Sequence, residues 1–196
     1  MMREATVERK TSETAILLRL AVDGSGKSRL STGIPFFDHM LTLFARHGLF
    51  DLELDAKGDL EVDCHHTVED TGITLGQALT KALGNKAGIR RYGHAYVPMD
   101  EALVRVVVDL SGRPFLAYSA PADVEPIGGN FSFQLVEEFL RALSVHGGMN
   151  LHVDILEGRD AHHMAEGVFK ALARALDQAT RMDPRVEGVP STKGSL

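Results

Sequence analysis

HHTVEDTGITLGQALTKAL (residues 65–83) and HHMAEGVFKALARALDQA (residues 162–179) are two copies of one pattern within the same chain. They align without gaps. The copies share both histidines, a glutamate four residues after the first histidine, and several later Leu and Ala positions. Repetition at this scale indicates that the chain contains a duplicated structural unit.

The segments upstream of each copy also align. FFDHMLTLFARHGLFDL (36–52) matches LVEEFLRALSVHGGMNL (135–151), which places His39 opposite Glu138. The repeat therefore predicts a domain organisation with a first unit at 1–93, a second unit at 94–182 and a C-terminal tail at 183–196.

Hydrophobic periodicity predicts the elements of each half. Apolar β-branched runs closed by glycine-containing turns are typical of strands, and apolar residues three and four apart are typical of helices. The order β-β-α-β-β-α, given twice, implies an α+β fold in which two helices cover each four-stranded sheet. We expect strands at 14–22, 50–54, 60–63, 103–109 and 150–156, and helices at 35–45, at 133–145 and after each His-His pair.

Composition excludes several classes of protein. Hydrophobic residues make up 44% of the 196 residues, and no apolar run approaches the roughly 18 residues that a membrane span requires. The net charge of −6 argues against a general nucleic-acid binder or a protein of anionic membranes. The charged start of the chain, MMREATVERK, has no apolar segment typical of a secretion signal, so the expected compartment is the cytoplasm.

Each HHxxE motif places metal-binding side chains on one helix. Positions i and i+4 share a helical face, so His65 with Glu69, and His162 with Glu166, can each bind one cation. The second histidine of each pair points about 100° away from the first. Imidazole and carboxylate ligands without thiolate suit Mn²⁺, Fe²⁺ or Zn²⁺.

The duplication suggests two equivalent metal sites related by a pseudo-twofold axis. Each site would take a His-Glu pair from one half and a single histidine, His66 or His163, from the other half. His39 and Glu138, which are equivalent in the repeat, would complete the two sites. Open coordination positions would admit a substrate.

Less specific interpretations apply to some of these residues. A single His-Glu pair at this spacing is more often a solvated pair on a helix surface, but two copies in register favour metal binding. His47 and His146 each precede a glycine, and we interpret them as residues at helix C-termini. His94, His152 and Cys64 are assigned to the core or the surface.

Eight segments in this order resemble imidazoleglycerol-phosphate dehydratases, and the resemblance extends over nearly the full length. The segments are ATVERKTSET (5–14), TGIPFFDHML (32–41), DLEVDCHHTVEDTGI (59–73), GIRRYG (88–93), PMDEAL (98–103), DLSGRP (109–114), HHMAEGVFKALARAL (162–176) and STKG (191–194). The resemblance implies a duplicated unit of the ribosomal S5 domain 2-like type. It also implies a homo-oligomer of 24 subunits built from trimers, with active sites shared between subunits and two Mn²⁺ in each.

By position, the resemblance also implies residue roles. One metal would be bound by His39, His66, His162 and Glu166, and the other by His65, Glu69, Glu138 and His163. Glu13 and Glu166, with Asp100 as a weaker candidate, would transfer protons. The phosphate would be bound by Arg91, Arg113, Ser191 and Lys193, the last two from the tail. The implied substrate-binding set is Glu13, His39, His65, Glu69, Arg91, Arg113, His162, Lys170, Ser191 and Lys193.

Two positions depart from the resemblance. Glu138 stands where many family members have His, and a carboxylate is still a competent metal ligand. Leu43 stands where a Gln associated with the phosphate site often occurs, so one phosphate contact is expected to be absent.

The implied reaction converts D-erythro-imidazoleglycerol phosphate to imidazole acetol phosphate and water, as a step of histidine biosynthesis. Our hypothesis is that two metals hold the ring as an imidazolate, whose electrons expel the distal hydroxyl group. Two alternatives use the same side chains: a dinuclear metal phosphatase acting on a small phosphate ester, and a non-catalytic protein that assembles through metal ions.

Overall fold

The computed structural model describes residues 3–121, 124, 127 and 131–196, which form two four-stranded sheets and four helices. The first half contributes β1 (Glu4–Lys10), β2 (Thr14–Ala21), β3 (Ser28–Ser31), α1 (Pro35–Gly48), β4 (Asp51–Gly58) and α2 (His65–Leu83). The second half contributes β5 (Tyr92–Met99), β6 (Ala102–Asp109), β7 (Phe115–Ser119), α3 (Gln134–Gly147), β8 (Asn150–Glu157) and α4 (Ala161–Thr180). The strand orders β1-β2-β4-β3 and β5-β6-β8-β7 are equivalent, which confirms the predicted α+β fold and its duplication.

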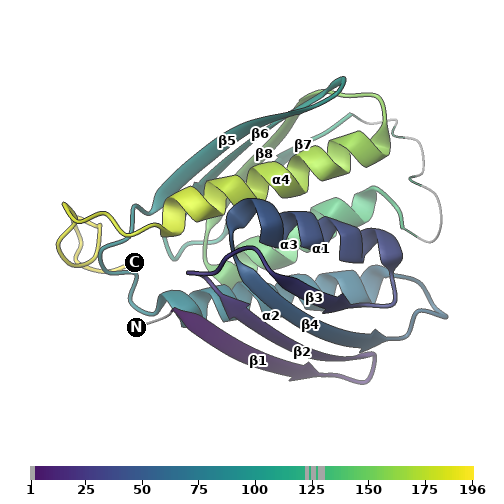
Figure 1. The fold of residues 1–196 in the computed structure, drawn as a ribbon, viewed down its shortest axis with the longest axis horizontal. Coiled ribbons are helices and arrows are strands. Elements are labelled where there is room, and N and C mark those ends of the chain that lie inside the picture. Colours follow the sequence, from purple (N-terminus) through teal and green to yellow (C-terminus); the bar gives the residue numbers. More distant parts are fainter. Residues whose placement is uncertain (1–2, 122–123, 125–126, 128–130) are drawn as a thin grey trace.

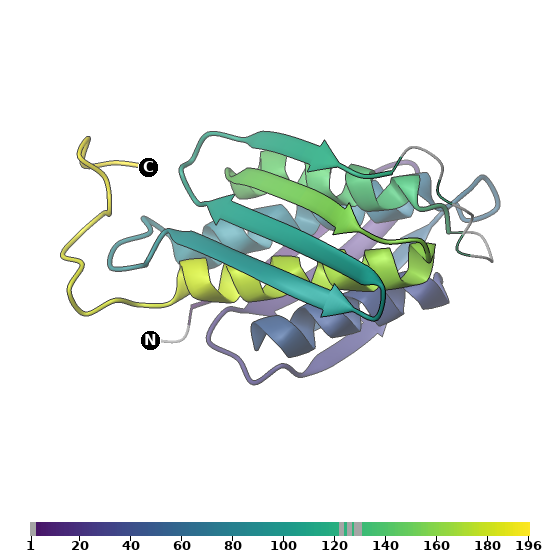
Figure 2. The ribbon, with the colours of Figure 1, turned by 90° about the horizontal axis from the view of Figure 1, so that it is seen from above.

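The four helices lie between the two sheets (Figure 1). The helix α2 packs on β1 and β2, and α4 packs on β5 and β6. The helices also pack on one another across the middle of the molecule, α2 against α3 and α1 against α4. All four helices begin at the same end of the molecule, and the C-terminal tail lies at the opposite end (Figures 1 and 2). Side chains carried by the first turns of the helices are therefore gathered at one end.

Alternation along the strands turns one face of each sheet toward the helices. In β2, Ile16, Leu18 and Leu20 are buried, whereas Leu17 and Arg19 face outward. This period of two is what a half-buried strand requires. The helices contribute the centre of the core, where the rings of Phe37, Phe139 and Phe169 pack together. The two halves thus share one hydrophobic core.

The order of elements differs from the prediction at one point in each half, because three strands precede the first helix and one follows it. The strand expected at 60–63 is wrong. There the amide of Val62 donates to the carbonyl of Asp59 (2.8 Å), and Asp63 Oδ1 accepts from the amide of His65 (2.7 Å), so the segment turns into α2. The fourth strand is β3, a short, mostly exposed edge strand that pairs in parallel with β4. Its sequence SRLS has too little apolar character to predict a strand.

The helix ends agree with the His-Gly prediction. The helices α1 and α3 end at Gly48 and Gly147, and the residue after each has a left-handed backbone, with φ of 56° at Leu49 and 59° at Gly148. Gly76 of α2 permits the close packing of α2 on α3, since a Cβ atom there would lie 2.7 Å from the amide nitrogen of Gly147.

The connection between the two sheets, at residues 84–91, holds the C-terminal tail. The amide of Gly88 donates to the carbonyl of Gly188, and the amide of Asp183 donates to the carbonyl of Gly88, both at 2.8 Å. These contacts place the tail beside the start of β5. Within the described residues, no helix combines the length and the apolar character that crossing a bilayer requires.

Candidate active site

Three predicted metal ligands meet between α1 and α4. Glu166 Oε1 lies 2.9 Å from His39 Nε2 and 3.1 Å from His162 Nε2. One ligand atom from each residue lies within 4.8 Å of the others, a spacing at which the three could hold a metal ion. His162 and Glu166 are one turn apart on α4, and His39 is brought to them because α1 packs on α4. The cluster therefore needs both halves of the chain.

Glu166 is held as an anion at the buried side of this cluster. Its side chain is 9% exposed, and Lys170 Nζ donates to Oε2 at 2.5 Å. Burial by itself would raise the pKa of Glu166. The hydrogen bonds from Lys170, His39 and His162 together outweigh burial and lower the pKa to about 2. Both oxygens of Glu166 are thus engaged, one by the histidines and one by the lysine.

The equivalent residues of the first half do not form such a cluster within one chain. His65 Nε2 and Glu69 Oε2 are 3.8 Å apart on α2, and both side chains are nearly half exposed. Glu138 is half-buried on α3, the helix that packs on α2. Among the described residues, His39, His162 and Glu166 are the only group of three ligands within 4.8 Å.

The second histidine of each motif is held by a carboxylate through its Nδ1 atom. Asp59 Oδ2 lies 3.0 Å from His66 Nδ1, and Glu101 Oε2 lies 2.8 Å from His163 Nδ1. These hydrogen bonds are the largest cause of the raised pKa of each histidine. A carboxylate on one ring nitrogen is the usual way to orient a metal-binding histidine, because it aims the other nitrogen outward.

Sequence reasoning missed Asp59 and Glu101. Both belong to segments quoted for the family resemblance, DLEVDCHH and PMDEAL, but neither lies three or four residues from a histidine. The rule that a metal-binding histidine pairs with a carboxylate would have prompted a search for them. The topology supplies them, since Asp59 directly follows β4 and Glu101 lies between β5 and β6.

Glu13 and Asp100, the candidates for proton transfer, occupy equivalent turns. Glu13 lies between β1 and β2 with Oε1 3.8 Å from His66 Nε2, and Asp100 lies between β5 and β6 with Oδ2 3.8 Å from His163 Nε2. Each carboxylate therefore lies beside the outward nitrogen of its histidine. The predicted ligand set places His66 with His39, His162 and Glu166. Within a single chain, His66 does not join that cluster.

The predicted phosphate-binding residues gather in a separate pocket of about 610 Å³. Arg91 is fixed there by Asp109, whose Oδ1 accepts from Nε at 2.7 Å, and by the carbonyl of Pro190, which accepts from Nη1 at 2.9 Å. Four predicted residues that are far apart in sequence are thus brought together. The lining consists of Arg91, Tyr92, Arg113, Pro190, Ser191, Thr192 and Lys193.

This predicted phosphate pocket and the cluster of predicted metal ligands lie at opposite ends of α4. The amide of Arg91 donates to the carbonyl of Ala179 (2.9 Å), whereas His162 is in the first turn of the helix. These positions differ by 179 − 162 = 17 residues, which is roughly 26 Å along the helix at 1.5 Å per residue. Figures 1 and 2 show the tail and the start of α4 at opposite ends of the molecule.

Comparison with known proteins identifies the family. The family model described as imidazoleglycerol-phosphate dehydratase matches residues 32–176. The chain belongs to this family. The imidazoleglycerol-phosphate dehydratase of Acetivibrio thermocellus is 60% identical over 196 residues, and the alignment covers 100% of both chains. That of Syntrophobacter fumaroxidans is 60% identical over 194 residues, which cover 99% of this chain and 98% of the relative.

Solved imidazoleglycerol-phosphate dehydratases have the same fold. The structure from Staphylococcus aureus superposes with a TM-score of 0.82 at 39% identity, covering 92% of this chain and 99% of that one. The structure from Pyrococcus furiosus superposes with a TM-score of 0.82 at 37% identity, covering 97% of this chain and 100% of that one. Glu13, Ser191 and Lys193 lie outside the part matched by the family model, but the full-length relatives span them. Neither the phosphatase nor the assembly-protein hypothesis gains support from these relatives.

Proposed function

We propose that this chain removes water from imidazoleglycerol phosphate to give imidazole acetol phosphate, as a step of histidine biosynthesis in the cytoplasm. The observation that carries the proposal is the cluster of His39, His162 and Glu166, which the two halves of a dehydratase-family chain build together. The reaction takes a proton from carbon and a hydroxyl group from the neighbouring carbon. It therefore needs a base for the carbon-bound proton. It also needs the imidazole ring to supply the electrons that expel the hydroxyl group, which leaves with a proton as water.

The donor set fits the implied Mn²⁺ cofactor. Two imidazoles and a carboxylate, without thiolate, are ligands that Mn²⁺ accepts. His39, His162 and Glu166 would hold one ion, and His65, Glu69 and Glu138 would contribute to the second site. His66 and His163 would complete the two sites from neighbouring chains. When bound, the metal supplies Lewis-acid stabilisation of negative charge on the ring.

The distance between the metal-ligand cluster and the phosphate pocket supports an active site shared between chains. Only a few single bonds of about 1.5 Å join the ring of the substrate to its phosphate, a span under about 10 Å. The cluster and the phosphate pocket of one chain are roughly 26 Å apart along α4. One substrate would therefore use the cluster of one chain and the phosphate pocket of another, within a homo-oligomer, which we propose to be the 24-mer of trimers.

Within this site, the free carboxylate of Glu13 is the better base for the carbon-bound proton. Both oxygens of Glu166 are engaged by His39, His162 and Lys170, which suits a ligand rather than a base. Glu13 has a side chain that is 47% exposed and lies next to the outward nitrogen of His66. Asp100 holds the equivalent place beside His163 and is a second candidate.

Removal and return of the metal tests this function. Protein stripped with a chelator is expected to lose turnover of imidazoleglycerol phosphate and to recover it when Mn²⁺ is added back. Formation of the ketone product and release of free phosphate are measured in the same reaction. Ketone without phosphate supports the dehydratase. Phosphate without ketone would indicate hydrolysis, and neither product with any metal would contradict an enzyme of this class.

The carboxylates on His66 and His163 give a second expectation. Asp59→Ala is expected to weaken Mn²⁺ binding by about 10-fold to 100-fold, because His66 loses the partner that orients it. Asp59→Asn should recover part of the loss, since its amide oxygen still accepts a hydrogen bond. Electron paramagnetic resonance of free Mn²⁺ during titration measures the affinity, with the exposed neighbour Glu61→Ala as the matched control. Unchanged Mn²⁺ affinity in Asp59→Ala would mean that Asp59 does not position a ligand.

A further inference from the structure

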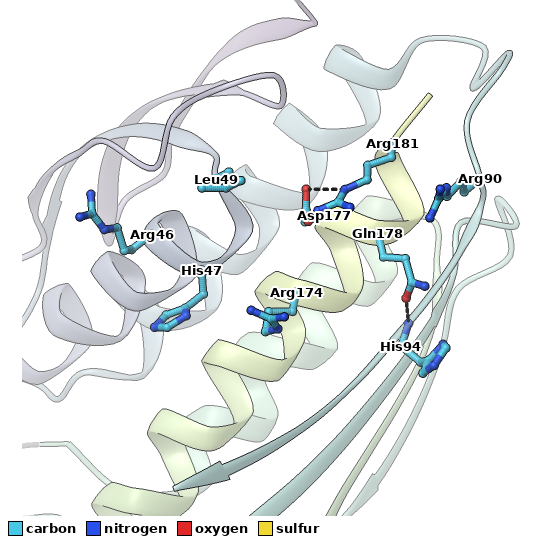
Figure 3. Close-up of a pocket in the computed structure, with 9 residues that line it drawn as sticks. All are labelled: Arg46, His47, Leu49, Arg90, His94, Arg174, Asp177, Gln178 and Arg181. Atoms are coloured by element: carbon cyan, nitrogen blue, oxygen red, sulfur yellow. Dashed lines mark hydrogen bonds and ion pairs between the residues drawn. The ribbon is translucent and has the colours of Figure 1, made fainter. Parts of the chain in front are cut away.

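A second pocket, of about 430 Å³, lies between the ends of α1 and α4 and the start of β5 (Figure 3). The cluster of metal ligands lies at the other end of these two helices. Four arginines line the pocket, together with a single carboxylate, in a chain whose net charge is −6. The lining consists of Arg46, His47, Leu49, Arg90, His94, Arg174, Asp177, Gln178 and Arg181.

Among the described residues, one of the four guanidinium groups pairs with a carboxylate. Asp177 pairs with Arg181 on the last turn of α4. Arg46, Arg90 and Arg174 have no carboxylate within 4.0 Å and no side-chain hydrogen bond among the residues that the structure describes. Figure 3 shows Arg174 beside the end of α1 that carries His47, with Arg90 and Arg181 on the other side of the pocket. Like charges placed together in this way repel one another unless an anion lies between them.

The walls of the pocket are fixed by hydrogen bonds from two backbone amides. The amide of Arg90 donates to the carbonyl of Arg181 (2.9 Å), and the amide of His94 donates to Gln178 Oε1 (2.7 Å). Gly93 allows β5 to approach α4 this closely, because a Cβ atom there would lie 1.9 Å from the carbonyl oxygen of Ala175. The arginines of the β5 side and of α4 are therefore presented by a rigid frame.

The field of the pocket also acts on His47. Burial is the largest cause of its lowered pKa, and the positive charges of Lys170 and Arg174 lower it further. A neutral His47 can donate its ring N–H to an anion, and guanidinium groups bind phosphate oxygens in a bidentate way. One phosphate group carries about 1.5 to 2 negative charges near neutral pH. A single phosphate would therefore not balance the positive charges of the three guanidinium groups.

We infer that this pocket binds a small molecule with two or more linked phosphate groups, at a site separate from the pocket of Arg113 and Lys193. The inference does not depend on the dehydratase reaction. Inorganic pyrophosphate and ADP share the required diphosphate, and both serve as probes. Arg174 would bind one end of the diphosphate, and Arg90 the other.

The test is calorimetric titration of the metal-free full-length protein with pyrophosphate and, separately, with ADP. Arg174→Ala and Arg90→Ala are each expected to weaken binding at least about tenfold, because each removes a charge-assisted contact. Arg174→Lys should retain part of the affinity, since it keeps the charge and loses the planar fork. Arg29→Ala removes an exposed arginine on β3 and is the matched control. ADP binding tighter than pyrophosphate would indicate a nucleotide ligand, and the reverse an inorganic one.

Two further variants separate this site from the phosphate pocket. Arg113→Ala should leave the affinity for pyrophosphate unchanged, whereas Arg174→Ala should weaken it. Arg174→Ala should in turn leave the KM for imidazoleglycerol phosphate unchanged. A KM raised by Arg174→Ala would assign the pocket to the substrate and overturn the inference. The inference would also be overturned if the wild-type protein bound neither pyrophosphate nor ADP. It would be overturned too if Arg90→Ala changed the mass of the particle and left the affinity for both ligands unchanged.

Discussion

His162→Ala is expected to reduce dehydratase turnover by more than about 100-fold and to lower the amount of Mn²⁺ bound per chain. Loss of an outer partner of a metal ligand already costs about 10-fold to 100-fold, and this change removes one of the proposed ligands. It also leaves Glu166 without one of the two histidines at its Oε1. Kinetics of ketone formation and metal content by elemental analysis measure the two effects.

Stability should change little in this variant, because the side chain of His162 is 45% exposed. Thermal unfolding of the stripped protein checks this point. His152→Ala, which removes an exposed histidine from β8, is the matched control and should keep its turnover. A His162→Ala protein with normal kcat and normal metal content would remove the cluster from the mechanism.

The fold was largely predictable because the sequence repeats its own pattern. Two copies of each helix, with the same apolar spacing, define the core faces that pack between the sheets. The exceptions are local. The DLEVD segment at 59–63 alternates like a strand, but hydrogen bonds from Val62 and His65 turn it into α2. The polar segment SRLS becomes β3 only because β4 offers it an edge.

The site was predictable where helical spacing decides it. His162 and Glu166 are one turn apart, and the alignment of the halves brings His39 into the same argument. Asp59 and Glu101 were missed because turns between strands carry them, and only the three-dimensional topology places these turns beside the histidines. The separation of the cluster and the phosphate pocket was missed for a similar reason, since it depends on the packing of Arg91 against the last turn of α4.

Two inactive variants are expected to restore activity to each other when they are assembled together. His162→Ala destroys the cluster and leaves the phosphate pocket intact. Arg113→Ala with Lys193→Ala removes two exposed cations of the pocket and leaves the cluster intact. The second variant should lose more than about 100-fold in kcat/KM, since each contact to a phosphate is charge-assisted.

Co-expression of these two variants with different tags, followed by isolation of mixed oligomers, measures directly whether one substrate uses two chains. If each site takes its cluster from one chain and its pocket from another, and the two variants assemble at random in equal amounts, about a quarter of the sites combine an intact cluster with an intact pocket. About a quarter of the wild-type kcat/KM is then expected. Mixed oligomers with no more activity than the two separate variants would show that each site lies within one chain, which would contradict the account.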